Sequence, residues 1–173
     1  MINKTVFISL ALVTSTAARA QFGTRQVLLN APVREVTAVF ISMADCCDAL
    51  TRELRGPVDS VRSILRTRAL RANESFRMIG VSLDWEPEVG WNYLRQFGAF
   101  DEIAVGSNWF GLHPEVLMFS GAGVEAAVPQ IVIYERTVAH GDARPTFGPR
   151  RILRSLRGRD QMVAWLNAGA PLP

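Results

Sequence analysis

The sequence predicts one α/β domain, with a central mixed sheet flanked by helices. Two apolar runs rich in strand-forming residues, at positions 36–42 and 76–83, are each followed by residues with helical spacing. A third such run lies at 130–136, and a short amphipathic segment lies around 162–166. Strands that alternate with helices are typical of layered α/β domains with right-handed crossovers.

The first 20 residues have the pattern of an export signal. A short basic start precedes a mostly apolar run at residues 5–17, and residues 18–20 form a small-x-small cleavage site. The apolar run is short for a transmembrane helix, although an uncleaved anchor is the alternative. We therefore expect residues 1–20 to be removed. Residues 21–173 should form a periplasmic or secreted domain without membrane attachment, in a compartment where disulfides persist.

The expected mature chain is nearly neutral. Lys4 and Arg19 leave with the signal, so 17 of the 19 basic residues remain beside 16 acidic residues. This gives no electrostatic reason to expect nucleic-acid binding. Six arginines do cluster between Arg144 and Arg159. No aromatic or Gly-rich phosphate motif accompanies them, so a solvated surface segment is the simpler interpretation.

The first strand leads into the only two cysteines of the chain. Cys46 and Cys47 follow it after a short turn, and Leu50 and Leu54 continue at helical spacing. A helix is therefore expected to begin near the cysteines. The macrodipole can stabilise a thiolate at the N-terminus of a helix, so the pair is a candidate redox site.

The middle of the chain is expected to continue with helix, strand, helix and strand. Gly56 and Pro57 should stop or kink the first helix, and apolar spacing predicts a second helical segment from residue 58 to about 71. The apolar run at 76–83 predicts a central strand buried on both faces. Pro87 suits the first turn of the following helix.

The remaining elements are predicted from turn residues and apolar runs. In order they are a helix stop at Gly98, a short strand at 100–105, loops with one helical turn or strand around 116–119, a strand at 130–136 preceded by Pro129, a loop at 140–149, a last strand at 151–156, and a closing helix capped by Asp160. A proline at the mouth of a strand must lie at its first residue or at an edge.

Four segments in this order resemble the thioredoxin-like fold, especially exported bacterial thiol-disulfide oxidoreductases of the cytochrome-maturation type. VTAVFISMADC resembles the strand that leads to the family's active-site cysteine, and FRMIGVSLD resembles its central strand. EVGWNYLRQFGAFDEIAVG resembles the next helix and strand, and VPQIVIYER resembles the strand that begins with the family's cis-proline. The resemblance covers most of residues 36–167 and implies a thioredoxin-like three-layer sandwich.

The resemblance also implies a site, although the active-site motif differs. The family motif is Cys-x-x-Cys, usually with Trp before the first cysteine. Alignment by strand length puts Cys46 at the nucleophile position, with Asp45 in place of the tryptophan and Ala49 in place of the resolving cysteine. Cys47 then becomes an accessory thiol, one residue after the nucleophile.

Three further positions are implied by the same resemblance. Pro129 falls at the cis-proline position, and Val128 carries the backbone that pairs with a bound peptide in the family. Asp84 lies near the place where relatives keep an acid below the cysteines for proton transfer. Together these residues would form the substrate groove and its acid.

The change to Cys-Cys limits the expected chemistry. In a Cys-x-x-Cys pair the second thiol resolves the mixed disulfide formed by the first. Here Cys47 or a partner's thiol would have to do so, and a disulfide between adjacent residues closes a tight, easily reduced ring. Asp45 and Asp48 oppose the helix dipole, so a less acidic thiol than in a standard oxidoreductase is expected.

The predicted function is a weak or specialised thiol-disulfide oxidoreductase. It would act without a cofactor on a protein thiol or disulfide partner in the cell envelope, with Cys46 as nucleophile. The alternative is a non-catalytic module that holds a protein beside Pro129 or through residues 106–127. A soft-metal carrier that adds His113 and His140 comes third, but adjacent cysteines chelate one metal poorly, so no metal site is predicted. Which cysteine faces the groove stays open.

Overall fold

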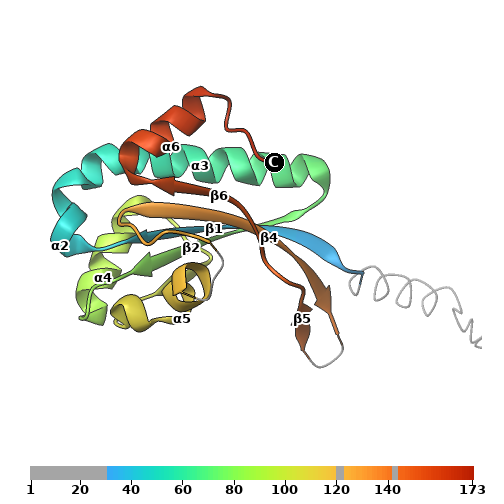
Figure 1. Cartoon of the computed structure of the whole chain (residues 1–173), viewed down its shortest axis with the longest axis horizontal. Helices are drawn as coiled ribbons and strands as arrows, with labels where there is room; N and C mark the ends of the chain where they lie inside the picture. Colours follow the sequence, from blue (N-terminus) through green and yellow to red (C-terminus); the bar gives the residue numbers. More distant parts are fainter. Residues whose placement is uncertain (1–30, 120–122, 142–143) are drawn as a thin grey trace, which may run out of the picture.

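The computed structural model describes residues 31–119, 123–141 and 144–173. The expected signal at residues 1–20 lies outside this part of the chain. Figure 1 shows a twisted sheet with helices above and below it. Within the described ranges, no helix is both long enough and apolar enough to cross a membrane.

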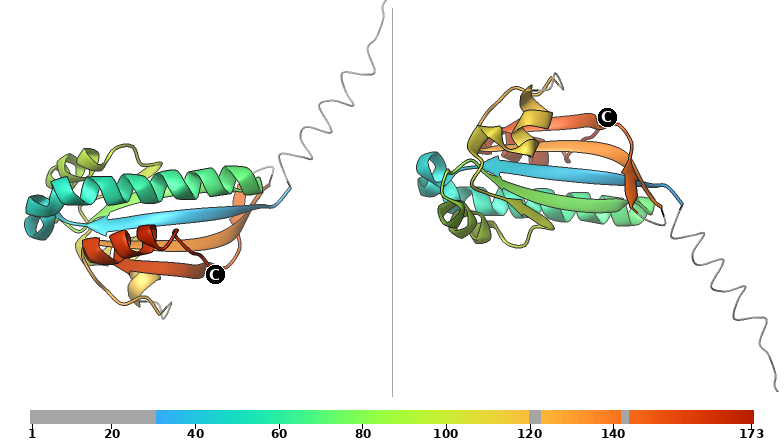
Figure 2. Two further views of the ribbon diagram at one scale, coloured as in Figure 1. Left: turned by 90° about the horizontal axis from the view of Figure 1, so that it is seen from above. Right: turned by 90° about the horizontal axis from the view of Figure 1, so that it is seen from below.

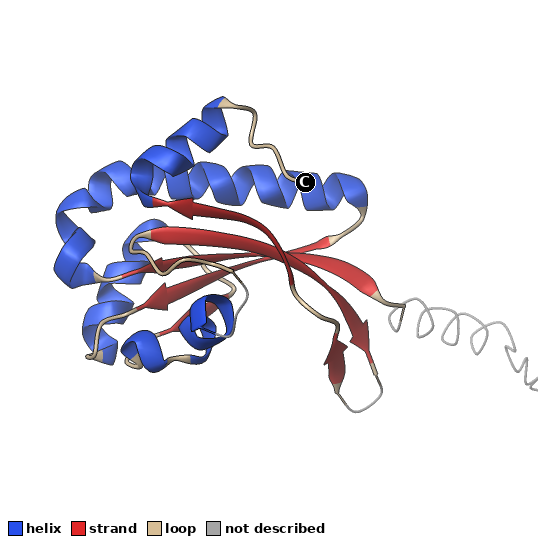
Figure 3. Ribbon diagram, viewed as in Figure 1, coloured by secondary structure: helices blue, strands red, loops and turns tan. Residues whose placement is uncertain are grey.

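The predicted α/β class with a mixed sheet is confirmed. The six strands of the described chain are β1 (Val33–Ser42), β2 (Ser75–Ser82), β3 (Glu102–Ala104), β4 (Gln130–His140), β5 (Pro145–Phe147) and β6 (Arg151–Arg157). Their order is β3-β2-β1-β4-β5, and β6 also pairs with β4. Neighbours from β1 to β3 are parallel, whereas β4 is antiparallel to β1, β5 and β6. Figure 3 shows these strands against the helices.

Helices and helical turns connect the strands. They are α2 (Ala44–Cys47), η1 (Asp48–Leu50), α3 (Thr51–Ala72), α4 (Pro87–Leu94), η2 (Arg95–Phe97), η3 (Asn108–Phe110), α5 (Leu112–Pro114), η4 (Glu115–Phe119) and α6 (Gly158–Asn167). The turns η1 to η3 are 3-10 helices, and η4 is a π-helical turn. Figure 2 shows α3 and α6 over one face of the sheet and α5 over the other.

Two apolar cores lie on the two faces of the sheet, because successive side chains of a strand point to opposite faces. Phe40 of β1 belongs to one core together with Leu54 of α3 and Trp165 of α6. Ile41 of β1 belongs to the other core together with Leu117 of η4. The strand β1 therefore forms the middle of both cores, and its residues 35–42 are all buried.

Of the stop or kink expected at Gly56 and Pro57, the stop is wrong, because α3 continues through both residues. The buried stripe of α3 includes Leu54 before the proline and continues at Val58 after it. Packing of this stripe outweighs the one backbone hydrogen bond that a proline removes. That lost bond would have gone to the carbonyl of Glu53, an exposed residue in the first turn of α3.

The loop expected at residues 140–149 is also wrong in part, because β5 lies within it and pairs with the end of β4. The ring of Phe147 packs on the Arg136 guanidinium at 4.1 Å, which holds this hairpin against the sheet. The closing helix begins at Gly158, ahead of the expected cap at Asp160. Its first turn is fixed by Gln161, which accepts the Arg157 N–H at 2.9 Å.

A buried ion pair crosses from β1 to β4. Nη2 and Nε of Arg136 lie 2.7 Å and 2.8 Å from Oε1 of Glu35. Their side chains are only 7% and 8% exposed. A charge in such a place is stable only while its partner is present, so each residue depends on the other.

Arg136→Met is expected to lower the free energy of unfolding by about 3–5 kcal/mol, because it leaves the Glu35 carboxylate buried without a cation. Urea unfolding measures this loss. The control is Arg77→Met, because Arg77 pairs with Glu102 where both side chains are about a third exposed. That variant should lose less than about 1 kcal/mol. Equal losses in the two variants would contradict the buried pair.

His113 lies in a partly buried, mostly cationic setting. Its Nε2 lies 3.4 Å from Oε1 of Glu102. Burial lowers the pKa of His113 below its ordinary value of 6.5, the Glu102 carboxylate raises it in part, and the charges of Arg150, Arg77 and Arg136 lower it further. The imidazole is therefore neutral at pH 7.

The depressed pKa of His113 predicts a loss of stability in mild acid. The unfolded imidazole takes up a proton near pH 6.5, whereas the folded one does so only at lower pH. His113 therefore does not reduce the free energy of unfolding above pH 6.5. This free energy falls as the pH drops from 6.5 to the pKa of His113 in the folded protein. His113→Gln should remove this slope. The chain has two histidines, so NMR titration of the His140→Gln variant reports His113 alone. A His113 titration midpoint at or above pH 6.5 would contradict the prediction.

Candidate disulfide site

The two cysteines form a disulfide with each other just beyond β1, with their Cα atoms 3.8 Å apart. Both lie in the short helix α2. Cys46 is exposed, whereas Cys47 is only 2% exposed and belongs to the core that contains Leu54. Solvent therefore reaches the disulfide from the side of Cys46, whereas Cys47 is buried in the core.

Asp84 fixes the start of the cysteine helix. Its Oδ1 and Oδ2 accept the Ala44 N–H at 3.2 Å and 3.1 Å, and the Ser82 hydroxyl donates to Oδ2. Asp84 follows β2 and is only 5% exposed. An acceptor at the first N–H of a helix satisfies a group that the helix leaves free. The predicted acid thus contacts the first residue of the helix that carries the cysteines.

The ends of β1 and β2 both contact α4, through residues that were not predicted from the sequence. The Ser42 and Tyr93 hydroxyls are 2.8 Å apart and buried. Gly90 of α4 lies directly against Ser82, and a Cβ at this position would overlap the serine side chain. A glycine inside a helix was the only local signal of this close contact.

The segment with Val128 and Pro129 lies beside the same end of β1. Strand register puts Gln130 opposite Ile41, so Pro129 lies level with Ser42, the last residue of β1 before the cysteine helix. The Val128–Pro129 peptide bond is cis. The Pro129 carbonyl accepts the Gly158 N–H at 2.8 Å. Among the described residues, none forms a hydrogen bond with the backbone of Val128.

Gln130 holds this segment in place and was not predicted from the sequence. Its side chain is fully buried and accepts the Ala127 N–H at 3.2 Å through Oε1. Its Nε2 donates to the Glu125 carbonyl at 3.1 Å and to the Ser155 hydroxyl at 2.7 Å. One amide thus joins the residues before Pro129 to the neighbouring strand β6.

Exposed aromatic rings flank the cysteine helix. Trp85 and Phe110 are 65% and 80% exposed, and their ring centroids are 6.0 Å apart. Trp85 lines a small pocket together with Asp45 of α2 and Asp84. Large exposed apolar side chains next to one another are typical of binding surfaces. We call Trp85 and Phe110 the aromatic pair.

Buried Asn108 positions the aromatic pair. Its Nδ2 donates to the Leu83 carbonyl at 2.7 Å, and its Oδ1 accepts the Trp109 N–H at 2.6 Å. These bonds hold the turn η3, which carries Phe110, against the chain that follows β2. Residues 108–110 were expected to form a loop. A side chain that bonds to the backbone of another segment leaves no local pattern.

The two histidines do not join the cysteines. His113 pairs with Glu102, and His140 is the last residue of β4. No group of three or more His, Cys, Asp or Glu residues that could hold a metal ion occurs in the described ranges. The soft-metal hypothesis therefore gains no support from the arrangement of these side chains.

After reduction, iodoacetamide is expected to label Cys46 at least about tenfold faster than Cys47, because a buried thiol reacts only when the structure opens locally. Peptide mass spectrometry gives both rates. Cys46→Ser and Cys47→Ser each leave one thiol and serve as matched controls. Labelling of Cys47 should reach the rate of Cys46 in urea. Equal rates in the folded protein would contradict the difference in burial.

No family model, curated protein or solved structure matches the chain. The site combines a disulfide between one exposed and one buried cysteine with a buried carboxylate at the start of its helix. Within the described chain, the backbone of Val128 beside it has no hydrogen bond.

Proposed function

We propose that this protein is a thioredoxin-like thiol-disulfide oxidoreductase of the cell envelope. Cys46 exchanges with the protein substrate, and Cys47 is its partner thiol. The observation that carries the proposal is the Cys46–Cys47 disulfide, which is open to solvent on one side only and sits on a helix directly after the central strand. The parallel pair β1 and β2, followed by antiparallel β4 and β6 and then α6, supports the thioredoxin-like assignment.

The exchange uses two substrate thiols. A substrate thiolate attacks Sγ of Cys46, the bond to Cys47 breaks, and Cys47 leaves as a thiolate that takes up a proton. A second substrate thiolate then attacks the substrate sulfur of the mixed disulfide. The substrate leaves as a disulfide, and both cysteines are left as thiols. The same steps in reverse reduce a substrate disulfide.

Other residues of the site have supporting roles in the proposal. Asp84 is the acid that exchanges a proton with Cys47, since its carboxylate contacts the start of the same helix. The backbone at Val128, which bonds to no other described residue, pairs with the substrate chain next to Pro129. The aromatic pair contacts apolar substrate side chains.

The proposal predicts that Cys47→Ser traps a mixed disulfide. The Cys46 thiolate of this variant attacks a synthetic peptide disulfide, and no second protein thiol is present to resolve the product. Mass spectrometry should show the adduct on Cys46. Cys46→Ser is the matched control and should form at least about tenfold less adduct, because Cys47 is buried. In the protein that keeps both cysteines, Asp84→Asn should change the pH dependence of the exchange with a peptide dithiol, because the proton exchange with Cys47 is lost.

Two results would contradict the redox proposal. One is equal adduct formation by the two single variants, and the other is no adduct with either. A binding module is the second candidate. Two observations favour it: the backbone of Val128 has no hydrogen bond within the described ranges, and the aromatic pair is exposed. It predicts that the reduced peptide binds the Cys46→Ser/Cys47→Ser double variant as tightly as wild type, while the wild-type disulfide does not exchange.

A further inference from the structure

The outer edge of β6 offers free backbone groups. In the described chain, β6 pairs only with β4. The Gly158 N–H donates to Pro129 across that pair, whereas the Arg157 N–H points outward to Gln161. Backbone groups of a strand alternate in direction, so the N–H and C=O of Ser155 also point outward. Gln161 therefore closes one end of this edge and leaves Ser155 open.

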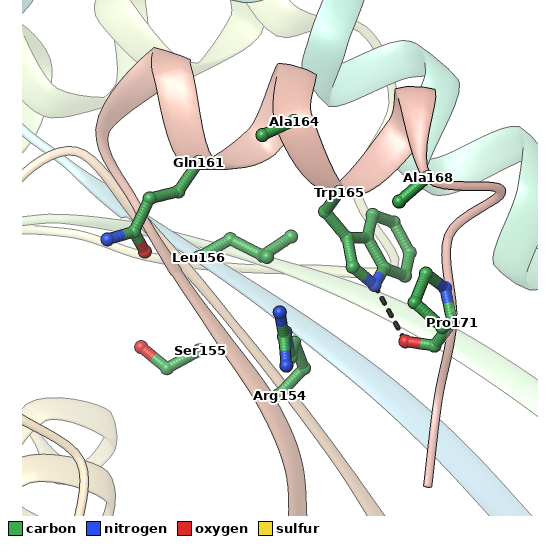
Figure 4. Close-up of a pocket in the computed structure, with 8 residues that line it drawn as sticks. All are labelled: Arg154, Ser155, Leu156, Gln161, Ala164, Trp165, Ala168 and Pro171. Carbon is green, nitrogen blue, oxygen red and sulfur yellow. Dashed lines mark hydrogen bonds between the residues drawn. The ribbon is translucent and has the colours of Figure 1, made fainter.

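A mostly apolar groove runs beside this edge, between β6 and α6 (Figure 4). It is lined by Arg154, Ser155, Leu156, Gln161, Ala164, Trp165, Ala168 and Pro171. The Trp165 Nε1–H donates to the Pro171 carbonyl at 2.8 Å, which fixes the C-terminal segment as one wall. The groove can therefore accept an apolar side chain beside a chain paired at Ser155.

The arginines that cluster in the sequence give this edge its charge. Arg151 pairs with Glu135, and Arg157 pairs with Glu125. Arg154 is exposed beside the groove and has no ion pair with any described residue. One cation next to the open backbone of Ser155 thus lacks an anion within the described chain.

A second copy of the chain is a poor occupant of this edge. Two β6 strands paired side by side would bring Arg151, Arg154 and Arg157 of one copy against the same residues of the other. Like charges on neighbouring strands are destabilising. A chain with carboxylates in these positions would be attracted instead.

We propose that the β6 edge binds an extended acidic segment of another protein. The segment adds as a strand at Ser155, places a carboxylate beside Arg154, and inserts an apolar side chain into the groove. None of the residues assigned to the exchange reaction takes part. The site is thus a docking surface separate from the disulfide.

The test uses labelled nine-residue peptides that alternate Val with Glu, Gln or Lys, with binding measured by fluorescence anisotropy. The Val/Glu peptide should bind, and Arg154→Glu should weaken it about tenfold through loss of attraction and added repulsion. Arg144→Glu makes the same charge change in the β4–β5 hairpin and should alter affinity less than about twofold. The Cys46→Ser/Cys47→Ser variant should bind like wild type.

Backbone pairing is tested with N-methylated Val/Glu peptides. The amides of every second peptide residue face β6, and the remaining amides face away from it. Methylation of the amides that face β6 should abolish binding, and methylation of the remaining amides should not. Four results would overturn the proposal. They are no binding at millimolar peptide, equal losses in the two arginine variants, equal effects of the two methylation patterns, and equally tight binding of a single-stranded DNA oligonucleotide.

Discussion

The strand β1 is the constraint on which the rest of the structure depends. It is hydrogen-bonded to β2 on one side and to β4 on the other, and apolar cores cover both of its faces. A strand enclosed in this way has one stable register, since a shift by one residue would exchange its two core faces. Its last residue, Ser42, therefore fixes where α2 begins, and the paired start of β4 fixes where Pro129 lies.

Polar groups at the end of this buried strand are satisfied by specific partners. Ser42 bonds to Tyr93, and Asp84 accepts both the Ala44 N–H and the Ser82 hydroxyl. An unpaired buried polar group costs about 1–3 kcal/mol, so these bonds favour one arrangement of the site. They also explain how a helix of only four residues, α2, stays in place.

Local sequence patterns predicted the elements whose burial repeats along the chain. The apolar runs that became β1 and β2, and the Pro87 start of α4, are cases of this kind. The errors arose where distant contacts decided the outcome. The stripe from Leu54 to Val58 carried α3 through Pro57, and the contact of Phe147 with Arg136 stabilised β5 within an expected loop. The cysteines, Asp84 and Pro129 were predicted as site residues. No local pattern pointed to Gln130 or Asn108.

The three hydrogen bonds of Gln130 affect the conformational entropy that ligand binding beside Pro129 would cost. Its buried amide ties the backbone at residues 125 and 127 to Ser155, so the chain before Pro129 is held from both sides. A loop that is ordered before a ligand arrives loses less conformational freedom on binding. In the proposed pairing of a substrate chain with Val128, the backbone of this residue would need little further ordering, and more of the contact energy would be available as affinity.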